Sequence, residues 1–64
     1  MIIKLNSSEI GWLKTIGYDV SPDEDMTDDF QIKLVDGITA ELQDLGDRER
    51  NIAEDIITKV TADW

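Results

Sequence analysis

The chain has 64 residues, of which 15 are acidic and 6 are basic, so its formal net charge at pH 7 is −9. It contains no Cys and no His, which excludes disulfides and thiolate–metal sites and removes the commonest general base and zinc ligand. With so few Lys and Arg, direct nucleic-acid binding is not expected, and an anionic membrane would repel the chain. The composition therefore favours a basic protein as the partner.

Size and hydropathy predict one small domain over residues 1–64. Apolar residues make up 41% of the chain and recur periodically, which is not typical of disorder. No apolar run approaches the ~18 residues of a transmembrane helix, and the first residues do not form a signal peptide, so we expect the protein to act in the cytoplasm. A domain of this size buries only ~60% of its unfolded surface, and a homodimer is therefore a further expectation.

The chain begins with MIIKLN, an apolar-rich segment typical of a short strand or an extended arm. A helix-start signature follows it. Asn6 can cap a helix, and Glu9 three residues later completes a capping box. Gly17 is a typical helix stop, so the sequence predicts a first helix over residues 7–16. The side chains expected to point inward are Ile10, Leu13 and Ile16.

The second predicted helix has two candidate starts. Ser21 can cap a helix with Pro22 at its first position, and Thr27 can cap a later one. At about 100° per residue one apolar face runs through this segment, Gly46 ends it, and Ile32 lies on the opposite side. The residues expected on the apolar face are Met26, Phe30, Leu34, Val35, Ile38, Leu42 and Leu45.

Residues 30–42 also fit a β-hairpin. Apolar residues alternate on both sides of Asp36-Gly37, a dipeptide typical of a two-residue turn, and Gly37 inside a helix costs ~1 kcal/mol relative to Ala. We favour the helix because Val35 and Leu45 join its apolar face. The expected fold is mainly α, with three short helices and an N-terminal strand or arm. An α+β fold with the hairpin is the alternative.

A third helix is predicted after Gly46, with Asp47 as its cap. Its apolar residues recur at helical spacing and fall on one face, backed by a polar face. The apolar face consists of Ile52, Ala53, Ile56, Ile57, Val60 and Trp64, and the polar face carries Glu54, Asp55, Thr58 and Thr61.

The densest charge lies in residues 18–30, YDVSPDEDMTDDF, where six of the thirteen residues are acidic. No Lys or Arg falls between Lys14 and Lys33 to neutralise them. Acids in the first turn of a helix complement its dipole by about 0.3–1 kcal/mol each, which explains two or three of the six. The surplus favours a basic partner. The residues predicted to form this acidic patch are Asp19, Asp23, Glu24, Asp25, Asp28 and Asp29.

Neither calcium binding nor catalysis is favoured for this run. Oxygen-bearing side chains alternate from Asp19 to Thr27, but an EF-hand needs Gly and a bidentate Glu where the sequence has Glu24 and Phe30. Acid–base work by paired carboxylates needs a cleft that raises one pKa, and a chain of this size has little interior to build one. The serines lack a His or an activating Lys. We expect no metal, no cofactor and no enzyme activity.

Three apolar residues are candidates for a partner or dimer interface. Trp12 can share a broad face with Ile16, so core packing is its first expected role, and Trp64 is expected to dock the last helix. Both can instead anchor an interface, where Trp is enriched. Ile32 is the better interface candidate because the predicted core does not use it.

Two functions fit these features. The first is a binding inhibitor that presents carboxylates to a basic groove in place of phosphates, with fast and salt-sensitive association. A nucleic-acid enzyme is the natural target class, because Lys and Arg line its channel. The second is a small acidic helical module that dimerises or docks an apolar face, with its acidity serving solubility alone.

A tiny acidic chain without Cys or His that begins with a short strand and a capped helix, as in MIIKLNSSEIGWLKTIGY, is similar in character to small phage and prophage proteins. Among these it resembles the type II-A anti-CRISPR proteins in size, charge and helical content over the whole chain. The resemblance implies an acidic, DNA-mimicking surface that blocks an RNA-guided nuclease, whose channel is positively charged. The secondary contributors expected beside the acidic patch are Asp36, Asp44, Glu54 and Asp55.

Overall fold

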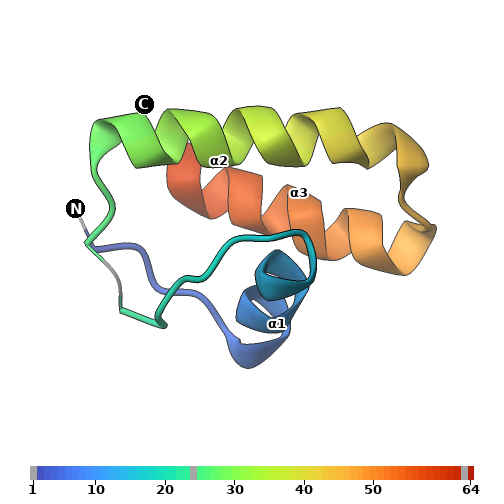
Figure 1. The fold of residues 1–64 in the computed structure, drawn as a ribbon, viewed down its shortest axis with the longest axis horizontal. Coiled ribbons are helices and arrows are strands. Elements are labelled where there is room, and N and C mark those ends of the chain that lie inside the picture. The colour runs from blue at the N-terminus through green and yellow to red at the C-terminus, as the bar shows by residue number, and fades with distance from the viewer. Residues whose placement is uncertain (1, 24, 63) are drawn as a thin grey trace.

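The computed structural model describes residues 2–23, 25–62 and 64. These residues form three α-helices, α1 (Ser7–Thr15), α2 (Asp28–Glu41) and α3 (Asp47–Thr61), so the mainly α prediction is confirmed. A 3-10 turn, Leu42–Asp44, continues α2. Figure 1 shows α2 and α3 side by side and antiparallel, as a helical hairpin, with α1 lying across α3. In the described part of the chain, no helix is long and apolar enough to cross a bilayer.

The alternative prediction of a β-hairpin over residues 30–42 is wrong, because residues 30–41 are continuous α-helix. Gly37, which suggested a turn, has a different reason for being glycine. A Cβ at this position would collide with the Tyr18 hydroxyl, and the Tyr18 Cζ would lie only 3.2 Å away. The missing side chain therefore lets the loop after α1 lie close against the backbone of α2.

The N-terminal segment is an extended arm. The β-type pairing recorded for the described residues is one isolated antiparallel bridge, between Ile2 and Asp25. The Leu5 N–H also donates to the Pro22 carbonyl at 3.3 Å. The arm therefore lies beside the acidic loop, the segment between α1 and α2 that carries Asp19, Asp23 and Asp25, and holds it close to the body of the molecule.

The ends of α1 follow the sequence signals. The Asn6 side chain accepts from the Glu9 N–H at 2.9 Å, and Glu9 Oε1 accepts from the Asn6 N–H at 2.8 Å, so the capping box is confirmed. At the other end Gly17 has φ +102°, and the Tyr18 N–H donates to the Leu13 carbonyl at 2.9 Å. This is a Schellman stop, which needs a residue that tolerates positive φ.

The second helix begins at one of its two predicted starts, and the third begins one residue before its predicted start. Thr27 caps α2, its hydroxyl accepting from the Phe30 N–H at 3.2 Å, so the later of the two candidate starts is used. Pro22 lies in a turn and not in a helix. The cap predicted at Asp47 is wrong, because Gly46 occupies the N-cap position and Asp47 is the first helical residue. There its charge still complements the helix dipole.

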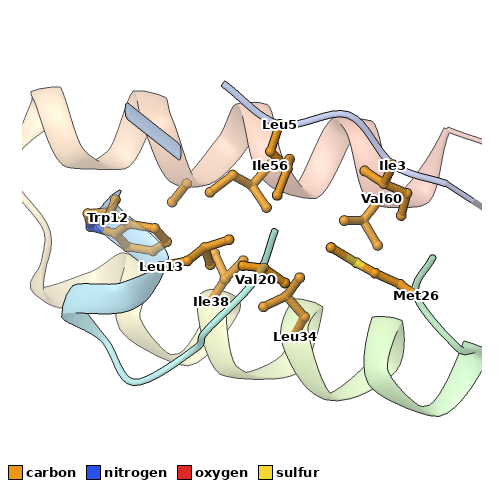
Figure 2. Packing of buried hydrophobic residues seen from close by; sticks show 11 residues of the cluster. Ile3, Leu5, Trp12, Leu13, Val20, Met26, Leu34, Ile38, Ile56 and Val60 are labelled. Atoms are coloured by element: carbon orange, nitrogen blue, oxygen red, sulfur yellow. The ribbon is translucent and has the colours of Figure 1, made fainter. Parts of the chain in front are cut away.

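The core forms where α3 packs on both other helices. Figure 2 shows Ile56 and Val60 of α3 facing Leu34 and Ile38 of α2. A fully buried side chain of this size contributes about 1.5–3 kcal/mol, so the core supplies most of the stability. The buried apolar residues are Ile3, Leu5, Trp12, Leu13, Val20, Met26, Leu34, Ile38, Ala53, Ile56 and Val60.

Two helices are rotated about their axes relative to the predicted faces. In α1, Ile10 and Ile16 are only half-buried, while Trp12 is buried beside Leu13. In α2, Gln31 is buried and Phe30 is half-buried. The prediction placed only apolar residues inward, whereas each helix buries one polar side chain three residues before an apolar core position.

Candidate docking groove beside the acidic loop

The acidic patch lies on the surface where α1 leads into α2. Its five described members, Asp19, Asp23, Asp25, Asp28 and Asp29, are all exposed, and Glu24 lies outside the described residues. Asp19, Asp23 and Asp25 lie between α1 and α2, and Asp28 and Asp29 lie in the first turn of α2. Among the residues that the structure describes, no three acids are grouped closely enough to hold a metal ion.

Asp28 and Asp29 also have a structural role. They occupy the first two positions of α2, directly after the Thr27 cap. Their charges are favourable there because the N-terminus of a helix carries a partial positive charge. Helix stability therefore accounts for Asp28 and Asp29. It does not account for Asp19, Asp23 and Asp25, which precede the helix.

Most large apolar side chains in the described residues are buried or half-buried, but three are exposed. Ile2, Ile32 and Trp64 are exposed by 58%, 50% and 64% respectively. Ile32 and Trp64 line one open groove of about 320 Å³, together with Asp28. The structure thus brings two predicted interface residues together with one member of the acidic patch. This groove is the candidate binding site.

A buried amide holds Trp64 in the groove. The Trp64 indole N–H donates to Gln31 Oε1 at 3.2 Å, and Gln31 Nε2 donates to the Met26 carbonyl at 3.0 Å. Gln31 is only 4% exposed, so few alternative positions are open to it. Gln31 was not predicted from the sequence, although it stands three residues before Leu34 and seven before Ile38, a spacing typical of one helix face.

Trp12 does not belong to this site. It is buried in the core, as its first expected role required, and Figure 2 shows it next to Leu13. A side chain covered in this way has little surface to offer a partner, so the interface prediction does not fit Trp12. Of the three interface candidates, Ile32 and Trp64 remain.

A second buried polar cluster lies outside the groove. Glu9 is 2% exposed, and its Oε1 accepts from Lys59 Nζ at 2.7 Å and from the Asn6 N–H. Its Oε2 is buried and makes no hydrogen bond within the described part of the chain. The pair joins the start of α1 to the last turn of α3. The sequence predicted the capping role of Glu9 but not its pairing with Lys59.

The secondary acids are spread over the hairpin. Asp36 lies on α2, Asp44 ends the 3-10 turn, and Glu54 and Asp55 lie on α3. All four are exposed, and none lines the groove. They extend the negative surface without adding to the candidate site.

Comparison with known proteins found no match. No family model, curated protein or solved structure matched this chain.

Proposed function

We propose that this chain is a non-enzymatic inhibitor that binds a basic protein in the cytoplasm of a bacterial host. The observation that carries the proposal is the groove in which Asp28, Ile32 and Trp64 meet beside the exposed acidic loop. A surface of this kind combines negative charge with apolar anchors, and both face solvent.

The two parts of the surface act on different steps of binding. The net charge of −9 attracts a basic partner at long range and raises the association rate, an effect that salt weakens. The exposed side chains of Ile32 and Trp64 are buried on contact and slow dissociation. Together they give association that is fast and still specific.

The proposed target is an RNA-guided CRISPR nuclease, in keeping with the resemblance to type II-A anti-CRISPR proteins. Such a nuclease holds its heteroduplex in a positively charged channel and reads DNA with arginines. Carboxylates along the acidic loop take the place of phosphates there. Direct nucleic-acid binding is not part of the proposal, because the chain has six basic residues against 15 acidic ones.

A DNA-cleavage assay with a purified type II-A nuclease tests this function. The intact protein is expected to inhibit cleavage, less so at high salt, and more strongly when added before the DNA. The variant D23N/D28N/D29N is expected to raise the inhibitory concentration at least tenfold. Its matched control, D44N/E54Q/D55N, removes the same charge from exposed positions outside the groove and is expected to change inhibition far less.

Two results would overturn the proposal. One is an unhindered nuclease at a large excess of protein, with no complex in sedimentation. The other is equal loss of inhibition in both triple variants, which would make the effect one of total charge. Thermal unfolding of each variant checks that the fold is retained, since Asp28 and Asp29 also support the start of α2.

Homodimerisation is the second candidate function, and the exposure of Ile32 and Trp64 favours it. A two-fold interface over the groove would bring each copy's Asp28 to the same contact, because such an interface uses one patch twice. Like charges in proximity oppose this. Sedimentation equilibrium at low and high salt separates the cases, since a dimer over the groove is expected to form only when salt screens the acids.

A further inference from the structure

We propose that the groove receives an arginine side chain of the basic partner, with its stem on Ile32, its guanidinium against the face of Trp64, and its donors on the Asp28 carboxylate. The inference rests on the proposed function and specifies the group that the groove recognises. The described lining residues, Asp28, Ile32 and Trp64, share one open space of about 320 Å³, so one side chain can meet them together.

The apolar part of the groove suits the stem of a long basic side chain. Ile32 is half-exposed and is not one of the core residues, so its side chain is open to a ligand. Long basic side chains lay their methylene groups along apolar surface while the charged head stays near water. A short or purely aliphatic side chain would cover Ile32 but leave the carboxylate unmatched.

The aromatic part suits a planar cation. Trp64 is 64% exposed, and its N–H is already bonded to Gln31, so the indole ring offers a partner its π-surface and not its donor. Trp is the best of the aromatic residues for cation–π contact, and Arg is found there more often than Lys. A guanidinium can stack flat on the ring, whereas an ammonium is a compact and more strongly hydrated charge.

The acidic part supplies the directional contact. Asp28 lines the groove with an exposed carboxylate, which can accept two parallel N–H bonds from one guanidinium. Asp19, Asp23 and Asp25 of the acidic loop add attraction without lining the groove. Charge complementarity therefore favours a basic occupant over a second copy of this acidic chain.

The site is also ordered before binding. Gln31 is buried and bonded to the Met26 carbonyl, and through this amide the ring of Trp64 is tied to the start of α2. A ring that is already held loses little rotational freedom when a ligand stacks on it. Gln31 is thus a positioning residue for the groove.

The test is an NMR titration of the labelled protein with acetylated hexa-arginine amide, compared with the hexa-lysine and hexa-citrulline peptides. The indole N–H signals of Trp12 and Trp64 are assigned with the W64L variant, which alters an exposed position. We expect the Trp64 signal to shift and saturate while the Trp12 signal stays in place. Hexa-arginine is expected to bind about two- to fivefold more tightly than hexa-lysine, and the uncharged hexa-citrulline not to saturate.

Matched variants locate the contact. W64L is expected to remove the preference for arginine, leaving both basic peptides with the same affinity. D28N is expected to weaken hexa-arginine more than D44N does, although each removes one charge. Q31L is expected to reduce the preference for arginine while the charge of the protein is unchanged.

The possible failures are distinct. Equal affinity for both basic peptides, unchanged in W64L, would overturn the arginine site but leave inhibition of the nuclease as a separate result. A Trp64 signal that moves with protein concentration alone would overturn it in favour of a second copy as the occupant. Arginine-selective binding combined with an uninhibited nuclease would support the groove and overturn only the proposed target.

Discussion

Two buried polar residues, Glu9 and Gln31, hold the same end of α3 in different ways. Glu9 reaches Lys59 through an ion pair, with a second carboxylate oxygen left without a hydrogen bond in the described structure. Gln31 reaches Trp64 through a neutral amide that also bonds the Met26 carbonyl. The comparison shows that the charged contact serves the fold, while the neutral one leads to the surface and positions a candidate binding residue.

The largest effect is expected from breaking the charged contact. Lys59→Met leaves the Glu9 carboxylate buried without its cation, and the free energy of unfolding is expected to fall by about 1.5–3 kcal/mol. The partly exposed position of Lys59 keeps the loss below that of a fully buried pair. Urea denaturation measures it. Lys33→Met, at an exposed position of α2, is the control, and an equal loss there would contradict the assignment.

A smaller effect is expected from removing the neutral contact. Gln31→Leu deletes both amide hydrogen bonds and leaves the Met26 carbonyl without the side-chain donor it has now, at a cost of about 1–2 kcal/mol. Unlike the lysine change, it is also expected to free the indole of Trp64, which lowers the fluorescence anisotropy of that residue. Gln43→Leu, at an exposed position of the 3-10 turn, controls for the loss of an amide. Unchanged anisotropy in the Gln31 variant would contradict its positioning role.

The smallest effect is expected when both charges of the Glu9–Lys59 pair are removed together. In Glu9→Gln/Lys59→Met the remaining carbonyl oxygen can still accept from the Asn6 N–H, while no buried charge is left unpaired. We expect the free energy of unfolding of the double variant to exceed that of Lys59→Met by about 1 kcal/mol. The denaturation curves of the two single variants and the double variant give this coupling. A double variant less stable than Lys59→Met would show that the charge of Glu9 is not the source of the loss.

The sequence predicted the parts of the fold that depend on local chemistry. The capping box at Asn6 and Glu9, the Gly17 stop and the Thr27 cap lie within a few residues of the bonds they make. The choice between a helix and a β-hairpin for residues 30–42 was harder. Glycine is needed at position 37 because Tyr18, in another segment, lies close against it. Local patterns cannot show such a contact.

The same distinction applies to the candidate site. Ile32 could be predicted because it falls outside the apolar face of its own helix, and it is exposed in the structure. Its position beside Trp64 and Asp28 depends on how α2 and α3 pack. The burial of Gln31 was not predicted, because only apolar residues were expected in the core. The partner of Glu9 stands 50 residues away in the sequence, beyond the range of any helical pattern.

That long separation has a consequence for how the molecule opens. The Glu9–Lys59 contact closes a loop of 50 residues, whereas α2 and α3 are joined by residues 42–46. Each doubling of loop length adds about 0.6 kcal/mol of chain entropy, so docking α1 costs about 2 kcal/mol more than closing the helical hairpin. We therefore expect the amide hydrogens of α1 to exchange with solvent before those of α2 and α3 when the fold loosens. The groove residues belong to α2 and to the segment after α3, so its lining stays assembled while α1 is detached.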